Sequence, residues 1–244
     1  AVQRRSFLSV GTFEGLNLVI LLHTSDWHLG KHLHGVSLLE DQAHALSQFV
    51  AMVRDIRPDL VIIVGDIFDR IHPQDEALEL YDSTLQQIVL DMKVKTIILP
   101  GNHDNGKRLT AGSWMAEKQG LHVVGSLESA LSPITLEDAD GPLHVHAIPY
   151  LDPYVINNYF RTQKIETHGG AGTALLEHLT RFRRLRKRAV RGIVAAYLQM
   201  EGVVAEGSER LLHAQVQEGV KVSAFEGLAY AALGFLHRAQ AFGD

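Results

Sequence analysis

The sequence predicts an α/β fold, and two observations support this class. Three short apolar segments, at residues 17–23, 60–64 and 95–99, are each followed by a polar loop, and helical periodicity fills the intervals between them. Such near-continuous apolar strands are typical of parallel βαβ units whose sheet is covered by helices. Beyond Gly120 the apolar segments are shorter with little helix between them, which indicates antiparallel strands of a second sheet.

Each element has its own sequence signal. Apolar residues recur every three or four positions from Leu39 to Ile56, which predicts a first helix that Pro58 ends. Tyr81, Leu85, Ile88 and Met92 mark a second helix with the same spacing. We expect later strands at residues 121–125, 143–150, 192–198 and 230–234, a helix over residues 171–188, and a hinge or loop at the glycine-rich residues 169–172.

Composition narrows the possible functions. The chain has 244 residues with 46% apolar residues, which suits one α/β domain over residues 17–244 after a poorly patterned extension at residues 1–16. The net charge of −5 argues against a protein that coats nucleic acid through its overall field, although a local basic patch remains open. Because cysteine is absent, any bound metal must have nitrogen and oxygen ligands. We find no apolar run long enough to cross a bilayer.

Polar residues follow the predicted strands where a ligand site is expected. Asp26 and His28 come directly after the first strand, Asp66 follows the second and Asn102 follows the third. Loops that leave the carboxyl ends of parallel strands converge at one edge of the sheet. Carboxylate, imidazole and amide groups together suit a divalent cation such as Mn²⁺, Mg²⁺, Fe²⁺ or Zn²⁺. A bridging carboxylate can also hold two such ions for phosphoryl displacement.

Five segments together resemble a known family. The combination DWH, GD and GNHD on successive strand ends, followed by a G-x-x-H turn, resembles the calcineurin-like metallophosphoesterases. Within that superfamily, the chain resembles the SbcD-type DNA repair nucleases over about residues 18–241. The segments that carry this likeness are LLHTSDWHLGK, VIIVGDIFDR, ILPGNHDN, HAIPYLDP and YAALGFLHRAQ.

The resemblance implies a fold, an activity and partners. The fold would have four layers, with two mixed β-sheets sandwiched between helices. The activity would be metal-dependent hydrolysis of DNA in double-strand-break repair, as a double-strand exonuclease and single-strand endonuclease, with Mn²⁺ as the metal in the family pattern. Implied partners are DNA, an SMC-like ATPase of the SbcC type and a second copy of the chain, in the cytoplasm. The capping segment and the ATPase-binding helices of the family would lie beyond Asp244.

The resemblance also assigns roles to individual residues. In the family pattern two divalent ions are held, and a nearby imidazole protonates the leaving oxygen or stabilises the developing charge. By this resemblance, Asp26, His28 and His237 would bind the first ion, and Asp66 would bridge the two ions. Asn102 would bind the second ion. His103 would be the imidazole, and Asp104 would orient it.

Two positions depart from the family pattern. Where the family has G-H-x-H this chain has GFLH, so Phe235 replaces one histidine ligand. Tyr197 replaces a second histidine ligand, which in the family lies at the end of an earlier strand. Phenylalanine cannot coordinate a metal, and tyrosine does so only after losing a proton with a usual pKa of about 10. We therefore expect an intact first site and a weak or empty second site. His213 is a remote candidate for a replacement ligand.

Alternative interpretations stay open. The ligand motifs alone are equally compatible with a phosphodiesterase for small diesters, and Tyr197 and Phe235 suit a catalytically silent DNA-binding or scaffolding subunit. The basic run at residues 181–188 could contact a DNA backbone. Its apolar stripe favours a simpler explanation, an amphipathic helix with a solvated basic face, and the stripe consists of Leu175, Leu179, Phe182 and Leu185.

Overall fold

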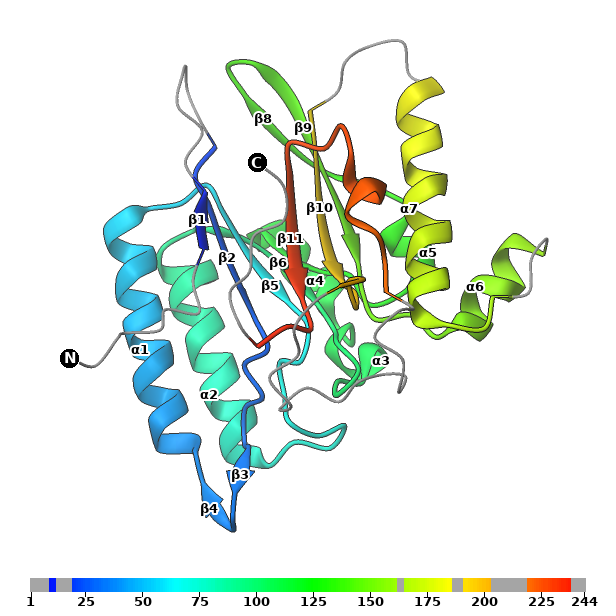
Figure 1. The fold of residues 1–244 in the computed structure, drawn as a ribbon. Helices are drawn as coiled ribbons and strands as arrows, with labels where there is room; N and C mark the ends of the chain where they lie inside the picture. Colours follow the sequence, from blue (N-terminus) through cyan, green and yellow to red (C-terminus); the bar gives the residue numbers. More distant parts are fainter. Residues whose placement is uncertain (1–8, 12–18, 162–164, 186–190, 203–218, 238–244) are drawn as a thin grey trace.

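Two β-sheets packed face to face form the centre of the molecule in the computed structural model (Figure 1). The structure describes residues 9–11, 19–161, 165–185, 191–202 and 219–237. The first sheet has the order β1-β2-β5-β6-β7, with β1 (Ser9–Gly11), β2 (Leu21–Ser25), β5 (Leu60–Val64), β6 (Lys95–Leu99) and β7 (Leu121–Val123). The second has the order β11-β10-β9-β8, with β8 (Ile134–Asp138), β9 (Gly141–Ile148), β10 (Arg191–Tyr197) and β11 (Tyr230–Gly234). A short hairpin joins β3 (His32–Leu33) to β4 (Val36–Ser37).

The first sheet is parallel apart from its edge strand β1. Strands β2, β5, β6 and β7 run parallel, and β5 and β6 have the boundaries that the sequence predicts. β1 belongs to the predicted N-terminal extension and pairs antiparallel with β2. All five residues of β5 are fully buried, since one face packs on helices and the other on the second sheet. The continuous apolar run of β5 is therefore explained by helices on one face and the second sheet on the other. The sequence had predicted helices as the cover of both faces.

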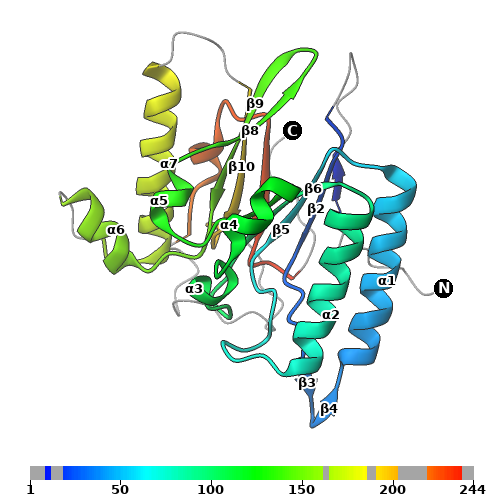
Figure 2. The same cartoon turned by 180° about the vertical axis from the view of Figure 1, so that it is seen from behind.

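Helices cover the outer face of each sheet and complete four layers (Figures 1 and 2). On the first sheet lie α1 (Leu39–Ile56) and α2 (Asp75–Leu85). On the second lie α5 (Leu127–Ala130), α6 (Pro153–Phe160) and α7 (His168–Leu185). The remaining short helices are α3 (Gly106–Leu109), α4 (Ser113–Ala116), η2 (Glu117–Gln119) and η3 (Val222–Phe225). This arrangement confirms the predicted class of two mixed sheets between helices.

The second predicted helix changes its winding near its end. α2 continues into a π-helical turn, η1 (Gln86–Asp91), where the amide of Met92 donates to the carbonyl of Gln87 at 3.0 Å. Ile88 and Val89 are buried within this turn. Among the described helices, none combines the length and apolarity needed to cross a membrane.

Two predictions about the later strands are wrong. Residues 121–123 pair parallel with β6 and complete the first sheet, whereas we expected them to begin the second. In the second sheet only β8 and β9 are antiparallel, because β9, β10 and β11 pair in parallel. The segments between these parallel strands carry α6, α7 and η3, so they provide the long crossovers that parallel pairing requires.

The glycine-rich segment at residues 169–172 is helical, so its predicted role as a hinge or loop is also wrong. It forms the first turn of α7, which packs closely on the end of β10. A β-carbon on Gly172 would lie 2.6 Å from Cδ2 of Leu198 and 3.0 Å from Cγ2 of Val220. The absence of a side chain therefore permits this close approach, and the packing overrides the poor helix propensity of glycine.

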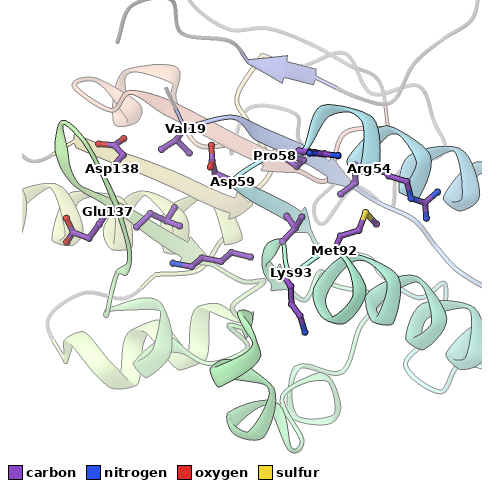
Figure 3. Close-up of a pocket in the computed structure, with 13 residues that line it drawn as sticks. Val19, Arg54, Pro58, Asp59, Met92, Lys93, Glu137 and Asp138 are labelled. Atoms are coloured by element: carbon purple, nitrogen blue, oxygen red, sulfur yellow. The ribbon is translucent and has the colours of Figure 1, made fainter. Parts of the chain in front are cut away.

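A hollow of about 840 Å³ opens at the edge where the parallel strands of the first sheet begin (Figure 3). Glu137 and Asp138 lie on one side of it and Arg54 and Met92 on the other. The predicted metal and catalytic residues follow the opposite ends of these strands. The hollow and the candidate site are therefore different places on the molecule.

Candidate metal centre

The loops at the carboxyl ends of β2 and β5 are tied to each other by their backbones. The amide of Asp26 donates to the carbonyl of Gly65 at 3.0 Å, and the amide of His28 donates to that of Asp66 at 2.9 Å. Asp26, His28 and Asp66 have φ angles of 55°, 46° and 47°, a left-handed conformation that is uncommon outside glycine. Such strained residues persist where the surrounding structure fixes them, and they concentrate at functional sites.

Three predicted ligands from both sheets converge next to these loops. Nε2 of His28 lies 3.1 Å from Nε2 of His237, which in turn lies 3.8 Å from Oδ1 of Asp26. Nε2 of His28 is also 3.6 Å from Oδ2 of Asp66. Ligand atoms about 2.1 Å from one divalent cation lie about 3.0 Å apart at right angles and about 4.2 Å apart when opposite. All three distances fall in this range, so Asp26, His28 and His237 fit a single divalent cation, with Asp66 beside them.

Tyr197, at the end of β10, occupies the space between the other two predicted ligands. Its hydroxyl oxygen lies 2.7 Å from Oδ2 of Asp66 and 2.6 Å from Oδ1 of Asn102. The hydroxyl has one proton, so it donates to one of these oxygens, and the second contact requires a donor on the partner, as when the Asn102 amide is flipped or Asp66 is protonated. The side chain is buried, and burial together with nearby carboxylates raises the pKa of Tyr197 well above its usual value.

Phe235 lies beside Tyr197 and meets Asp26 through its backbone. Its amide donates to Oδ2 of Asp26 at 3.1 Å, and its ring contacts that of Tyr197 edge-on with centroids 5.8 Å apart. The φ angle of Phe235 is 96°, which strains a side-chain-bearing residue. The two residues that depart from the family pattern are thus packed together at the centre, one against each of two predicted carboxylate ligands.

His103 is held by Asp69, a residue to which the sequence analysis assigned no role. Nδ1 of His103 lies 2.8 Å from the carbonyl oxygen of Asp69, so it carries the proton and leaves Nε2 as the acceptor in the neutral ring. The carboxylate of Asp69 also lies 3.5 Å from Nδ1 of His28. The amide of His103 donates to Oδ1 of Asp66 at 2.9 Å. The second aspartate of GDIFD was the available sequence signal for the carboxylate beside His28, but not for the carbonyl contact with His103.

Asp104 does not orient His103 as predicted, because its carboxylate binds backbone amides. Oδ2 accepts from Gly101 at 2.8 Å and from Ile67 at 3.0 Å, while Oδ1 accepts from Phe68 at 3.0 Å. It therefore joins the loop after β6 to the loop after β5. Its effect on His103 is indirect and comes from fixing the two loops that carry the centre.

Burial sets the protonation of the centre. Desolvation raises the pKa of Asp26 to about 8, although a hydrogen bond with Ser25 opposes the rise. Desolvation, helped by the charges of His237 and His103, lowers the pKa of His28 to about 3. Burial also raises the pKa of Asp104 to about 6. Without a cation, the centre thus favours a protonated Asp26 and a neutral His28.

Tyr150 and His168 form an aromatic pair next to Tyr197 that the sequence analysis did not identify. The rings of Tyr150 and His168 stack with centroids 4.8 Å apart, and the Tyr150 hydroxyl lies 3.1 Å from Nε2 of His168. The ring of Tyr150 also meets that of Tyr197 edge-on at 6.3 Å. HAIPYLDP was the only sequence signal here, and it contains Tyr150 without indicating its partner.

Two earlier candidates cannot be placed at this centre. His213 lies outside the described residues. The basic run at residues 181–188 begins in α7, and its side chains are likewise outside the described part of the chain.

Comparison with known proteins finds a matching family model and a related sequence. The family model for the calcineurin-like phosphoesterases matches residues 20–215. The SbcD component of the nuclease SbcCD from Staphylococcus epidermidis is 34% identical over 217 residues, which cover 89% of this chain and 56% of that protein. The chain thus spans about half the length of this relative. The likeness to SbcD-type sequences is confirmed at this level.

Solved structures resemble the chain only loosely. The crystal structure of TT1561 of Thermus thermophilus is 13% identical with a TM-score of 0.42, and covers 77% of this chain and 70% of that one. A further crystal structure is 14% identical with a TM-score of 0.48, and covers 82% and 81% of the two chains. Superpositions at these scores carry no weight beside the family match. From the match over residues 20–215, the chain belongs to the calcineurin-like phosphoesterase family.

Proposed function

We propose that this chain is the metal-dependent nuclease core of a DNA repair complex, hydrolysing phosphodiester bonds of DNA. The observation that carries the proposal is the convergence of Asp26, His28 and His237 within coordination distances, beside a histidine of fixed tautomer. A carboxylate and two imidazoles are ligands for a borderline divalent cation, and Mn²⁺ is our choice among those that suit this set. Family membership supports the hydrolase chemistry.

Each residue of the centre has a proposed task. Asp26, His28 and His237 hold the cation, and Asp66 completes its ligands at 3.6 Å from His28. When bound, a divalent cation supplies Lewis-acid stabilisation of charge on a phosphate ester. The left-handed turns at Asp26, His28 and Asp66 keep these donors in place before any ligand arrives. Little reorganisation is then required on binding.

His103 is the proposed proton-transfer group. Because its Nδ1 proton is committed to the carbonyl of Asp69, the proton exchanged during the reaction must be carried by Nε2. The protonated ring donates from Nε2 to the leaving oxygen, and the neutral ring accepts a proton there. Asp104 serves this step by fixing the loop that carries His103.

DNA and an SMC-like ATPase of the SbcC type are the proposed partners, with a second copy of the chain as a further one and the cytoplasm as the location. The similarity to the SbcD component of the nuclease SbcCD supports these assignments. The proposed activities are exonuclease action on duplex DNA and endonuclease action on single strands.

The proposal is tested by incubating the purified chain with Mn²⁺ and linear duplex DNA. We expect nucleotide release that chelation stops and that Asp26→Asn lowers by at least tenfold, with His44→Ala on the exposed face of α1 as the control. Turnover of bis-p-nitrophenyl phosphate without DNA cleavage would contradict the nuclease proposal in favour of a small-molecule phosphodiesterase.

A catalytically silent DNA-binding subunit is the second candidate. The observation that favours it is the Tyr197 hydroxyl between Asp66 and Asn102, since it occupies the position where these two oxygens would bind a second cation. This candidate predicts that the chain binds DNA ends and yet releases no nucleotide at any Mn²⁺ concentration. The same incubation, followed by a DNA-binding titration, separates the two functions.

A further inference from the structure

The oxygens of Asp66 and Asn102 converge on a position that a side chain already fills. Oδ2 of Asp66 and Oδ1 of Asn102 lie 2.7 Å and 2.6 Å from the hydroxyl oxygen of Tyr197. A divalent cation bound by the same two oxygens would lie about 2.0 to 2.2 Å from each. A cation on that side of Asp66 and the hydroxyl would therefore overlap, and only one of them fits.

Tyr197 cannot leave this position without disturbing the core. A β-carbon on Gly65 would lie 1.9 Å from Cδ2 of the tyrosine, so the ring rests directly on the backbone at the end of β5. Phe235, which is 2% exposed, covers the ring edge-on from the neighbouring strand. The backbone of Tyr197 is paired with Gly234 of β11. The ring is thus enclosed on several sides, and its hydroxyl is aimed at the two ligands.

The remaining donors describe one cation position. Among the described residues, two groups of metal-ligating side chains lie close enough together to hold an ion, namely Asp26 with His28 and His237, and His28 with Asp66 and His103. Both groups include His28, whose Nε2 faces His237 and Asp66. Its other ring nitrogen faces the carboxylate of Asp69. The two groups therefore share a ligand and do not make two independent sites.

We propose that the Tyr197 hydroxyl takes the place of a second cation, so that this chain binds a single divalent ion. The hydroxyl satisfies Asp66 and Asn102 by hydrogen bonding, and Phe235 closes the apolar side of the position. This inference deepens the proposed function and rests on its metal centre, but it concerns the number of ions bound and not the substrate.

The test is the stoichiometry of Mn²⁺ binding, measured by equilibrium dialysis and by the electron paramagnetic resonance of the bound ion. We expect one Mn²⁺ per chain, with the spectrum of an isolated ion. The double variant Tyr197→His with Phe235→His replaces the hydroxyl and its apolar wall with two imidazoles. We expect it to bind two ions per chain, with the spectrum of an exchange-coupled pair.

Tyr154→His is the matched control, since Tyr154 is 71% exposed on α6 and the variant adds a histidine outside the centre. It should bind one ion. Two tightly bound ions in the natural chain, or none, would overturn the inference, as would a folded double variant that still binds one. If the double variant does not fold, the natural chain alone decides. A chain that binds one ion and leaves DNA intact would contradict the proposed function and still support this inference.

Discussion

Nε2 of His28 lies 3.1 Å from Nε2 of His237, although the two residues are 209 positions apart in the chain. Two imidazole nitrogens at this distance need a proton between them or a cation that both can bind. The lowered pKa of His28 leaves its ring neutral at physiological pH. A bound divalent cation would therefore replace one weak hydrogen bond with two coordination bonds, and this exchange underlies the first prediction.

Removing His237 should abolish cation-dependent stabilisation. At a Mn²⁺ concentration one hundred times Kd, binding adds about 2.7 kcal/mol to the free energy of unfolding. For a chain of this size that corresponds to a rise in Tm of about 5 to 10 °C. His237→Ala should lose this rise in thermal unfolding with and without Mn²⁺, and the exposed variant His44→Ala should keep it. A full rise in His237→Ala would contradict the ligand assignment.

Without metal, the chain should lose stability as the pH rises from 6.5 to 8. The pKa of Asp26 is raised to about 8 in the folded protein, so the folded state holds a proton that the unfolded state has released, and stability falls as pH approaches 8. The lowered pKa of His28 acts in the opposite direction, but only between about 3 and 6.5. Above 6.5 the carboxyl therefore dominates.

This pH effect is measured by urea unfolding in the presence of a chelator. Over most of this range the folded state holds about one proton more than the unfolded state, which lowers the free energy of unfolding by roughly 2 kcal/mol as the pH rises. Asp26→Asn should reduce the dependence, and Asp66, whose pKa is also raised by burial, contributes the part that remains. The same protonation predicts that Mn²⁺ binding tightens with rising pH up to about 8, because the cation must displace the proton. An affinity independent of pH between 6.5 and 8 would argue against a protonated Asp26.

His103→Ala should slow the reaction and leave the cation in place. General acid–base groups contribute about a hundredfold to ten-thousandfold to rates, so a fall in kcat of that size is expected for DNA cleavage. The apparent affinity for Mn²⁺ should change little, since Asp26, His28 and His237 are the proposed ligands and Nδ1 of His103 is bonded to the Asp69 carbonyl. His122→Ala on β7 serves as the control. Loss of Mn²⁺ binding in His103→Ala would instead make this histidine a ligand.

Gly101→Ala should disrupt the centre through a steric clash. A β-carbon at this position would lie 2.2 Å from Oδ1 and 2.4 Å from the backbone nitrogen of Asp66, so both the carboxylate and the backbone of this ligand must move. Overpacking of this kind costs about 1 to 3 kcal/mol of stability, and Mn²⁺ should no longer raise Tm. Gly227→Ala meets open space and has only its left-handed backbone, at φ 77°, to strain. It should lose about 1 kcal/mol and keep the Mn²⁺ response.

The parts of the fold that follow local rules could be predicted from the sequence. β5 and β6 matched their predicted boundaries because strands buried on both faces are continuous apolar runs. The parallel pairing of β9, β10 and β11 was missed, since partner choice depends on crossovers whose path the local sequence does not reveal. Residues 121–123 were given to the wrong sheet for the same reason.

At the centre, ligand type could be predicted from strand-end position, but side-chain partners could not. Asp104 was expected to orient His103, but in the structure Nδ1 of His103 is hydrogen-bonded to the carbonyl of Asp69. Backbone acceptors leave no mark on the sequence, because any residue type supplies a carbonyl. The contact of Tyr197 with both Asp66 and Asn102 likewise joins three different strands, which only the assembled sheets bring together.

The centre draws Asp26, Asp66 and Asn102 from one sheet and Tyr197 and His237 from the other. The two sheets come into close contact at Gly234, since a β-carbon there would lie 2.1 Å from the carbonyl oxygen of Val64. His237 follows β11, so the ligand set of Asp26, His28 and His237 is complete only where the second sheet is docked on the first. A cation held by these three residues therefore links the two sheets and opposes their separation.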